Sequence, residues 1–424
     1  MKTLTIQQAR LIDPRHGQDT VTDIHLAEGK VCGIGKTPSG FKAEEIVPAH
    51  GLIACPGLVD LSARLPVLEA ELRAAVAGGV TTLVSPPDIR PTLDEAENVE
   101  RLTHNAAKVG LARLLPLGAL TLGLKGERLS ELLALRKAGC IAFSQGRFPV
   151  QDTEVLLRAF EYAATFNLPV WLHPRDFHLG RHGIAHDGEV ATRLGLAGIP
   201  IAAETVAIAT ALALAAQTGV RLHFQRISAA ASCALIAEAQ RQGQTVTCDI
   251  AIHHLHGTED ALNFFDSQAR FDPPLRSAED QAALRKAAQQ GLAVLCSDHT
   301  PLGNDDKWLP FPDALPGATA LELLLPLTLQ WAAETGVSLR DALACLTDGP
   351  AHVLGAAFED SGHLGVGARA DLCLFDPDST WTVTPESLQS TGKHSPLMGK
   401  TLKGQVVQTF SGGRTVFKRD CPHQ

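Results

Sequence analysis

Short apolar runs alternate with longer Ala- and Leu-rich stretches from about residue 58 to residue 355 of this 424-residue chain. The runs suit buried strands, whereas the stretches have the length and composition of helices. Consecutive parallel strands need a crossover, usually a helix, so the alternation predicts a parallel α/β fold whose repeat number suits a (β/α)8 barrel of TIM type. The strand-like runs lie at residues 81–84, 141–143, 169–172, 221–224 and 293–296, and the helical stretches include residues 153–166 and 204–217.

Both ends of the chain are typical of short strands joined by turns. Residues 3–9 alternate polar and apolar side chains, and the turn Ser411-Gly412-Gly413 near the other end separates two strand-like runs. Such a glycine turn between strands predicts a β-hairpin. We therefore expect a small β-sandwich domain built from residues 1–57 and 360–424, beside a barrel of residues 58–359.

Composition excludes several classes of protein. The net charge of −9, with no Lys/Arg run, argues against a nucleic-acid-binding surface. The nine cysteines are scattered without a CxxC pair, which indicates a reducing compartment. No signal-like core opens the chain, and we find no apolar run close to the roughly 20 residues of a membrane span. The expectation is a cytoplasmic protein without a membrane partner.

The residues that follow each predicted strand are the candidates for a functional site. Barrels of this kind place their chemistry at the C-terminal ends of the strands. After the first strand, Ser62 and Arg64 are separated by one residue, so their side chains should point to the same face. Later strand ends carry Asp88, Gln145, His173, Arg226 and Asp298.

The chain resembles the amidohydrolase superfamily, and the dihydroorotases in particular. Residues 56–66 resemble the first barrel strand of these enzymes, and Ser297-Asp298-His299-Thr300-Pro301 resembles their last strand end. Similar stretches at residues 187–204, 253–255, 272–276 and 349–351 extend the likeness over nearly the whole chain. The resemblance implies an amidohydrolase-type barrel and, for an active member, zinc-dependent hydrolysis of a cyclic amide.

The metal ligands that the resemblance implies are mostly replaced. The family carries histidines at the positions of Ser62, Arg64 and Arg226, whereas His173 and Asp298 keep ligand-type side chains. A guanidinium cannot lose its proton and would repel a dication. Two of the five metal-ligand positions therefore keep a side chain that can bind zinc, whereas a catalytic zinc needs about three protein ligands.

Two further positions depart from the family pattern. Asp88 stands where the resemblance implies a substrate-holding asparagine, and Gln145 stands where one class of dihydroorotases has an aspartate near the metal. A carboxylate at position 88 would repel an anionic substrate. Residues 139–146 contain no lysine that could serve as a carboxylated bridging ligand.

These replacements lead to a structural hypothesis. A buried Asp298 without a metal would be costly unless it were paired. We expect Arg64, Arg226 or both to lie beside Asp298 and to replace the metal's charge with guanidinium. We therefore expect no catalytic residues and no metal or other cofactor; any retained zinc would be held by His173 and Asp298.

The resemblance also implies a function. A non-catalytic dihydroorotase homologue of this kind acts as a structural or assembly subunit of the aspartate carbamoyltransferase complex in pyrimidine biosynthesis. Its implied partner is the aspartate carbamoyltransferase catalytic chain, and self-association is expected as well.

Two alternatives remain open at this point. The chain could be an active cyclic amidohydrolase with a zinc site rebuilt from His173, Asp298 and another histidine; the candidates are His223, His253 and His299. It could also be a metal-free sensor of an anionic metabolite, with a positive lining made by Arg64, Arg175 and Arg226. We expect His253, His254 and His256 to belong to a strand-end loop rather than to a metal site.

Overall fold

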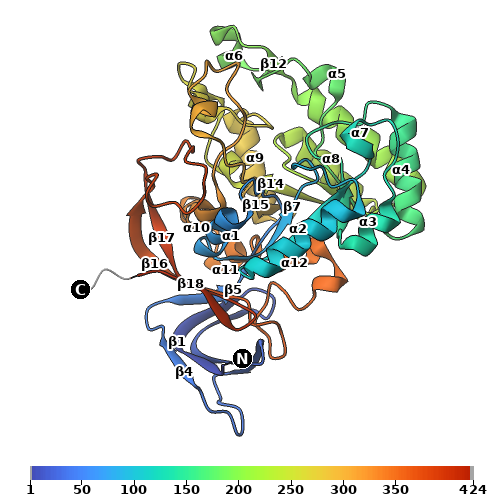
Figure 1. The fold of residues 1–424 in the computed structure, drawn as a ribbon. Helices are drawn as coiled ribbons and strands as arrows, with labels where there is room; N and C mark the ends of the chain where they lie inside the picture. The colour runs from blue at the N-terminus through green and yellow to red at the C-terminus, as the bar shows by residue number, and fades with distance from the viewer. Residues whose placement is uncertain (1, 421–424) are drawn as a thin grey trace.

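A parallel eight-stranded sheet forms the centre of the computed structural model, which describes residues 2–420 (Figure 1). Every pairing between neighbouring strands in it is parallel. The backbone bridge between Ala63 and His299 brings the two edges together, so the fold is a (β/α)8 barrel, as predicted. Its strands are β6 (Leu58–Asp60), β7 (Val80–Ser85), β8 (Arg113–Ala119), β9 (Ala142–Ser144), β10 (Val170–Leu172), β13 (Leu222–Phe224), β14 (Val246–Ala251) and β15 (Val294–Cys296).

Helices surround this barrel and connect its strands. Polar caps start several of them: the carboxylate of Asp152 accepts the backbone N–H of Glu154, and the hydroxyl of Ser277 accepts that of Asp280. The helices are α1 (Leu68–Ala77), α2 (Ala96–Val109), α3 (Leu132–Ala138), α4 (Thr153–Thr165), α5 (Phe177–Gly180), α6 (Glu189–Leu194), α7 (Ile201–Thr218), α8 (Ala230–Arg241), α9 (Ala278–Gln289), α10 (Leu324–Thr335), α11 (Leu339–Ala344) and α12 (Asp348–Leu354).

Short elements occupy the loops between these helices and strands. The strands β11 (Ala185–His186) and β12 (Gly198–Ile199) pair with each other beyond the C-terminal ends of the barrel strands. The single turns of 3-10 helix are η1 (Leu122–Leu124), η2 (Ile252–Leu255), η3 (Glu259–Leu262), η4 (Ser267–Ala269), η5 (Asn304–Lys307), η6 (Leu321–Leu323) and η7 (Ala356–Phe358).

Helix α7 corrects one expectation from the sequence. Its 18 residues have a mean hydropathy of 1.5, which is long and apolar enough to cross a membrane by length and composition. We had found no run close to that length. In the sequence, Glu204 interrupts the apolar pattern of this helix. In the structure its carboxylate is buried and accepts hydrogen bonds from Ser228 and Arg276, so it is not exposed on the helix. The helix packs against α4 and α8 as part of the outer ring.

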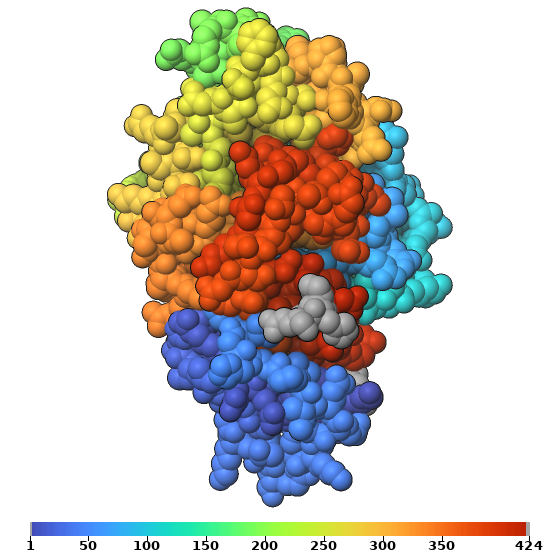
Figure 2. Space-filling view, turned by 90° about the vertical axis from the view of Figure 1, so that its left-hand side faces the viewer, coloured from blue at the N-terminus to red at the C-terminus, as the bar shows by residue number. Residues whose placement is uncertain are grey.

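The two ends of the chain share a second eight-stranded sheet. Strand β5 pairs with β1 on one side and with β16 on the other, where Cys55 lies opposite Cys373. Strands β17 and β18 form the hairpin predicted around Gly412 and Gly413. In Figures 1 and 2 the blue N-terminal and red C-terminal segments meet below the barrel. The strands are β1 (Leu4–Asp13), β2 (Gln18–Ala27), β3 (Lys30–Ile34), β4 (Glu45–Pro48), β5 (Ile53–Pro56), β16 (Leu372–Thr382), β17 (Thr401–Ser411) and β18 (Arg414–Lys418).

Candidate functional site

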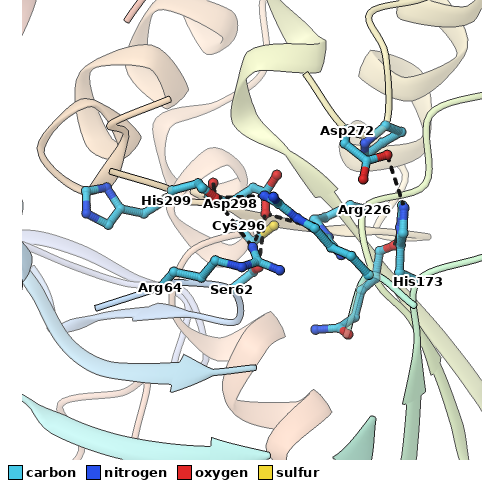
Figure 3. Close-up of polar contacts among 12 residues, drawn as sticks. Ser62, Arg64, His173, Arg226, Asp272, Cys296, Asp298 and His299 are labelled. Atoms are coloured by element: carbon cyan, nitrogen blue, oxygen red, sulfur yellow. Dashed lines mark hydrogen bonds and ion pairs between the residues drawn. The ribbon is translucent and has the colours of Figure 1, made fainter. Parts of the chain in front are cut away.

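Asp298 is the centre of a buried ion-pair cluster at the C-terminal ends of the barrel strands (Figure 3). It follows β15, and its backbone is in the left-handed region with φ 47°. Its Oδ1 lies 3.0 Å from Arg226 Nη1 and 3.5 Å from Arg64 Nη1. The hydroxyl of Ser62 donates a hydrogen bond of 3.3 Å to the same oxygen. Ser62, Arg64 and Arg226, the positions where the resemblance implies histidine ligands, therefore all converge on this carboxylate.

Arg226 is held in place by its own backbone as well as by Asp298. It follows β13 with φ 55°, and its backbone N–H donates to Asp249 Oδ1 at 2.7 Å. Its side chain is 2% exposed. Burial by itself would lower the pKa of this guanidinium, but Asp298 raises it above its usual range. Arg226 is thus a fixed buried cation at a position where the resemblance implies a metal ligand.

Arg64 joins Asp298 to a second carboxylate. Its Nη2 lies 2.8 Å from Asp88 Oδ2, and both side chains are almost completely buried. Burial raises the pKa of Asp88, but the positive charges of Arg64 and Arg147 outweigh it and lower this pKa to about 2. The same arginines and Arg226 hold the pKa of Asp298 below its usual range against the effect of burial. Both carboxylates are therefore ionised at neutral pH.

Arg147 is a member of this cluster that we did not single out in the sequence. It lies just after the Gly146 turn, and its backbone N–H donates to Asp88 Oδ2 at 3.2 Å. Its Nη2 donates to Thr300 Oγ1 at 3.1 Å. Burial and the neighbouring Arg64 lower the pKa of Arg147 to about 10, so it remains a cation. Its position shortly after the end of β9 is the feature of the sequence that could have identified Arg147 as a site residue.

His173 lies at the end of β10 but turns to another carboxylate (Figure 3). Its Nε2 is 3.7 Å from Asp272 Oδ1, which also lies 3.1 Å from Arg175 Nη1. Burial, and then the charge of Arg226, lowers the pKa of His173. Asp272 belongs to a stretch recognised in the sequence only as family-like, and the structure makes it part of the site.

Gln145 takes no part in the Asp298 cluster. It follows β9, and its amide group exchanges hydrogen bonds of 2.8 and 3.0 Å with the hydroxyl of Thr121. The side chain of Gln145 is therefore hydrogen-bonded to a residue just after β8 rather than to Asp298.

Two of the three histidines proposed for a rebuilt zinc site are hydrogen-bonded to carboxylates away from Asp298. His299 Nε2 lies 2.9 Å from Glu71 on α1, and its Nδ1 accepts the backbone N–H of Ala320 at 3.0 Å. His223 lies between Thr247 and Asp249, at 2.8 Å from each. His253 sits on η2 in the loop after β14, where we expected this histidine-rich stretch. Two of the three candidate histidines are thus paired with other carboxylates, whereas Nε2 of His253 is buried without a hydrogen-bond partner among residues 2–420.

The charge balance of the cluster leaves no net negative charge to attract a metal cation. Four arginines, Arg64, Arg147, Arg175 and Arg226, face three carboxylates, Asp88, Asp272 and Asp298. Within residues 2–420, the group of three side chains close enough to share a metal ion is Asp13, His16 and His363, outside the barrel. The donor set at the barrel site thus does not fit a catalytic zinc.

A cavity of about 550 Å³ lies beside the cluster, between the strand-end loops and α2. Arg64 and Asp88 form its inner wall, while Arg90, Arg101 and Asn105 line its outer part. Its lining carries three guanidinium groups and one carboxylate, which suits an anion better than a cation.

Solved structures place this architecture in a class. The chain is similar to L-hydantoinase (dihydropyrimidinase) from Arthrobacter aurescens, with a TM-score of 0.87, 25% identity, and coverage of 99% of this chain and 96% of that one. The fold is also that of dihydropyrimidinase from Brevibacillus agri, with a TM-score of 0.82 at 20% identity over 98% of this chain and 95% of that one. The barrel and its strand-end site define a protein of the amidohydrolase class.

Sequence comparison narrows this class to a family. A dihydro-orotase-like family model matches residues 51–232, and an amidohydrolase family model matches residues 176–417. A dihydroorotase-like protein of Pseudomonas aeruginosa is 44% identical over 97% of this chain and 98% of its own length. A dihydroorotase of Syntrophotalea carbinolica is 38% identical over 99% of both. The chain belongs to the dihydroorotase-like family.

Proposed function

We propose that this chain is a catalytically inactive dihydroorotase homologue that serves as a structural or assembly subunit of the aspartate carbamoyltransferase complex in pyrimidine biosynthesis. Its partner would be the aspartate carbamoyltransferase catalytic chain, in the cytoplasm, and the chain would also self-associate. A barrel can lose its catalytic groups and keep its fold, because the packed core and the strand-end loops are separable.

The observation that carries this proposal is the pairing of Asp298 with Arg226 and Arg64. In a metal-dependent relative the corresponding carboxylate would bind the metal or accept a proton. In this chain Oδ1 of Asp298 is paired with the guanidinium groups of Arg226 and Arg64, and it also accepts a hydrogen bond from the hydroxyl of Ser62. A carboxylate whose pKa is held low by cations is a weak general base.

The test of inactivity combines metal content with turnover. The purified chain is assayed for dihydroorotase activity in both directions, with and without added zinc, and the same sample is analysed for bound metal. We expect no turnover. Turnover that is lost in His173→Gln and in Asp298→Asn would mean that the barrel still holds a working site and would overturn the proposal.

Exposed apolar side chains on two neighbouring loops support a protein-binding surface on this chain. Phe264 and Trp308 are each 82% exposed, and Leu309 and Leu315 are nearly half exposed. Their loops are joined by hydrogen bonds from Lys307 Nζ to two backbone carbonyls, and Figure 2 shows the yellow and orange segments side by side at the upper end. Large exposed apolar side chains gathered on one part of a protein mark interaction sites. Co-purification with the aspartate carbamoyltransferase catalytic chain tests the association.

A second candidate function is favoured by the cavity of about 550 Å³. Arg90 and Arg101 line its outer part without a carboxylate partner among residues 2–420, whereas Arg175 and Arg226 are committed to aspartates. The sequence suggested Arg64, Arg175 and Arg226 as the positive lining of a sensor pocket. In the structure, the arginines that line the cavity are Arg64, Arg90 and Arg101. This reading makes the chain a binding protein for a small dianion.

A further inference from the structure

Helix α7 has an uncharged, largely apolar outer face, although it lies in the outer ring of helices (Figure 1). Its 18 residues include one charged side chain, Glu204, which is buried. Only 33% of the helix is buried. A surface helix normally carries charged and polar side chains on its outer face, and a helix that is apolar all round is normally covered. The outer face of α7 therefore has the character of an interface.

Small side chains make up most of this face. The exposed residues of α7 are Ala202, Val206, Ala209, Ala213, Ala216 and Gln217. The alanines and Val206 follow one another at steps of three or four residues, which places them on one side of the helix. Alanine side chains allow a second helix to approach closely, because the distance between packed helices depends on the side chains at the contact.

The uncharged surface continues onto both neighbours of α7 in the fold. On α8, which packs against α7, Ala231 and Ala234 are exposed, and the charged residues of this helix lie in its last turns. On α5, which also packs against α7, Leu179 is 43% exposed. Helix α4 is different, because its outer face carries Arg158 in exposed ion pairs with two glutamates. The surface therefore extends over α5, α7 and the first part of α8.

A cavity of about 100 Å³ lies at the edge of this surface. Ala207 and Thr210 of α7 contribute to its lining, and Phe148, in the loop after β9, lines it as well. The ring of Phe148 is 53% exposed. The surface thus offers both an exposed apolar side chain and a hollow beside it. A face with both features can be complementary to its own copy, as a two-fold contact requires.

The charge of the chain favours a second copy as the occupant of this face. The net charge is −9, so two copies repel each other over most of their surfaces. Near a two-fold axis, moreover, a charged side chain meets its own copy, and like charges across an interface are unfavourable. A face without exposed charge avoids this repulsion. A different protein could be matched by opposite charges, which α7 does not provide.

We propose that the outer face of α7, with the adjoining parts of α5 and α8, is an interface between two copies of this chain. The two α7 helices would lie antiparallel across a two-fold axis that passes near Ala209, the middle of the helix. This interface specifies the self-association that forms part of the proposed function, and it rests on that part alone. It uses neither the barrel site nor the exposed rings of Phe264 and Trp308.

Sedimentation velocity of the full chain over a range of concentrations tests this interface. We expect Ala209→Glu to halve the mass of the wild-type assembly and to raise its dissociation constant at least about a hundredfold, because two carboxylates meet at the axis. Ala209→Lys should have the same effect for the same reason. Ala282→Glu is the matched control. It adds the same charge at an exposed position of α9, between the exposed Glu279 and Lys286, and should leave the mass unchanged.

An equal mixture of Ala209→Glu and Ala209→Lys identifies the occupant. The wild-type mass should return in the mixture, because each glutamate then meets a lysine of the other copy. A wild type that is monomeric at every concentration, an unchanged mass in Ala209→Glu, or no recovery in the mixture would overturn the proposal. The melting temperature of each variant shows whether it folds, and Val206→Glu, at another exposed position of the same face, replaces a variant that does not.

Two other outcomes would give this face a different occupant and overturn the proposed interface. In the first, a monomeric wild type co-purifies with the aspartate carbamoyltransferase catalytic chain and Ala209→Glu loses that partner, which leaves the assembly role standing. In the second, a monomeric wild type binds vesicles of phosphatidylcholine and phosphatidylglycerol and Ala209→Glu does not, which assigns the face to a membrane surface. Turnover by the chain is measured separately and bears only on the proposed inactivity.

Discussion

The guanidinium of Arg226 lies 3.0 Å from the carboxylate of Asp298, and both side chains are almost completely buried. The two residues follow different barrel strands, β13 and β15. In a metal-dependent barrel these positions would meet at a shared cation. Here the cation is part of a side chain, so the charge that balances Asp298 cannot dissociate.

Removing Arg226 should destabilise the fold strongly. Arg226→Met leaves Asp298 with only Arg64 and Ser62, and breaking a buried pair on one side costs about 3–5 kcal/mol in the free energy of unfolding. Urea unfolding measures this loss. The double variant Arg226→Met/Asp298→Leu should recover much of it, because no unpaired charge then remains. Arg158→Met, which removes an arginine from exposed pairs on α4, is the control and should change stability little.

Asp88 should make stability fall in acid. Its pKa in the folded chain is lowered from 3.8 to about 2, so its ion pair contributes stability that is present above pH 3.8 and is lost as the pH falls through 2. The shift corresponds to about 2 kcal/mol. Asp88→Asn should therefore be less stable than the wild type at pH 6, and the difference should shrink towards pH 2. A constant difference would contradict the ion-pair explanation; Asp378→Asn, at an exposed pair, is the control.

Returning histidines to the replaced positions should restore metal binding in the barrel. Ser62→His, Arg64→His and Arg226→His together remove two cations and add three imidazoles beside His173 and Asp298. We expect zinc to bind there, measured by elemental analysis of the purified variant beside the wild type. Ser62→His alone leaves both arginines in place and should bind no zinc in the barrel. A folded triple variant without zinc would mean that more than these ligands has been lost.

A small dianion should stabilise the chain if the cavity beside the cluster is a binding site. Carbamoyl aspartate is the probe, and a saturable rise in melting temperature is the expected result. Arg101→Ala should weaken the effect, because Arg101 lines the cavity. Arg128→Ala removes an exposed arginine that does not line it, and serves as the control. No shift with the probe would remove the sensor alternative.

The exposed aromatic surface should be needed for assembly. Phe264→Ser with Trp308→Ser removes its two most exposed rings and should reduce co-purification with the aspartate carbamoyltransferase catalytic chain at least about tenfold, since aromatic anchors dominate interfaces. Val21→Ser, at a 69% exposed position in the sheet domain, is the control. Full retention of the partner by the double variant would place the interface elsewhere.

Much of the barrel could be predicted because buried strands and helices leave a periodic pattern. Five strand-like runs of the sequence correspond to β7, β9, β10, β13 and β15. Strands β8 and β14 were not recognised. Pro116 interrupts the apolar pattern of β8. Strand β14 carries the buried Asp249, whose partners are His223 on β13 and Arg226 just after it. A polar residue satisfied by tertiary contacts looks like a surface residue in the sequence.

The sequence by itself determined which chemical groups stand at the strand ends. It showed that Ser62, Arg64 and Arg226 cannot act as a histidine cluster, because side-chain type decides which atoms can bind a metal. Only the tertiary structure decided where those groups point. It turned His299 towards Glu71, brought Arg147 to Asp88, and placed His16 beside His363. These relationships depend on distances between segments far apart in the chain, and local propensity and periodicity carry no information about them.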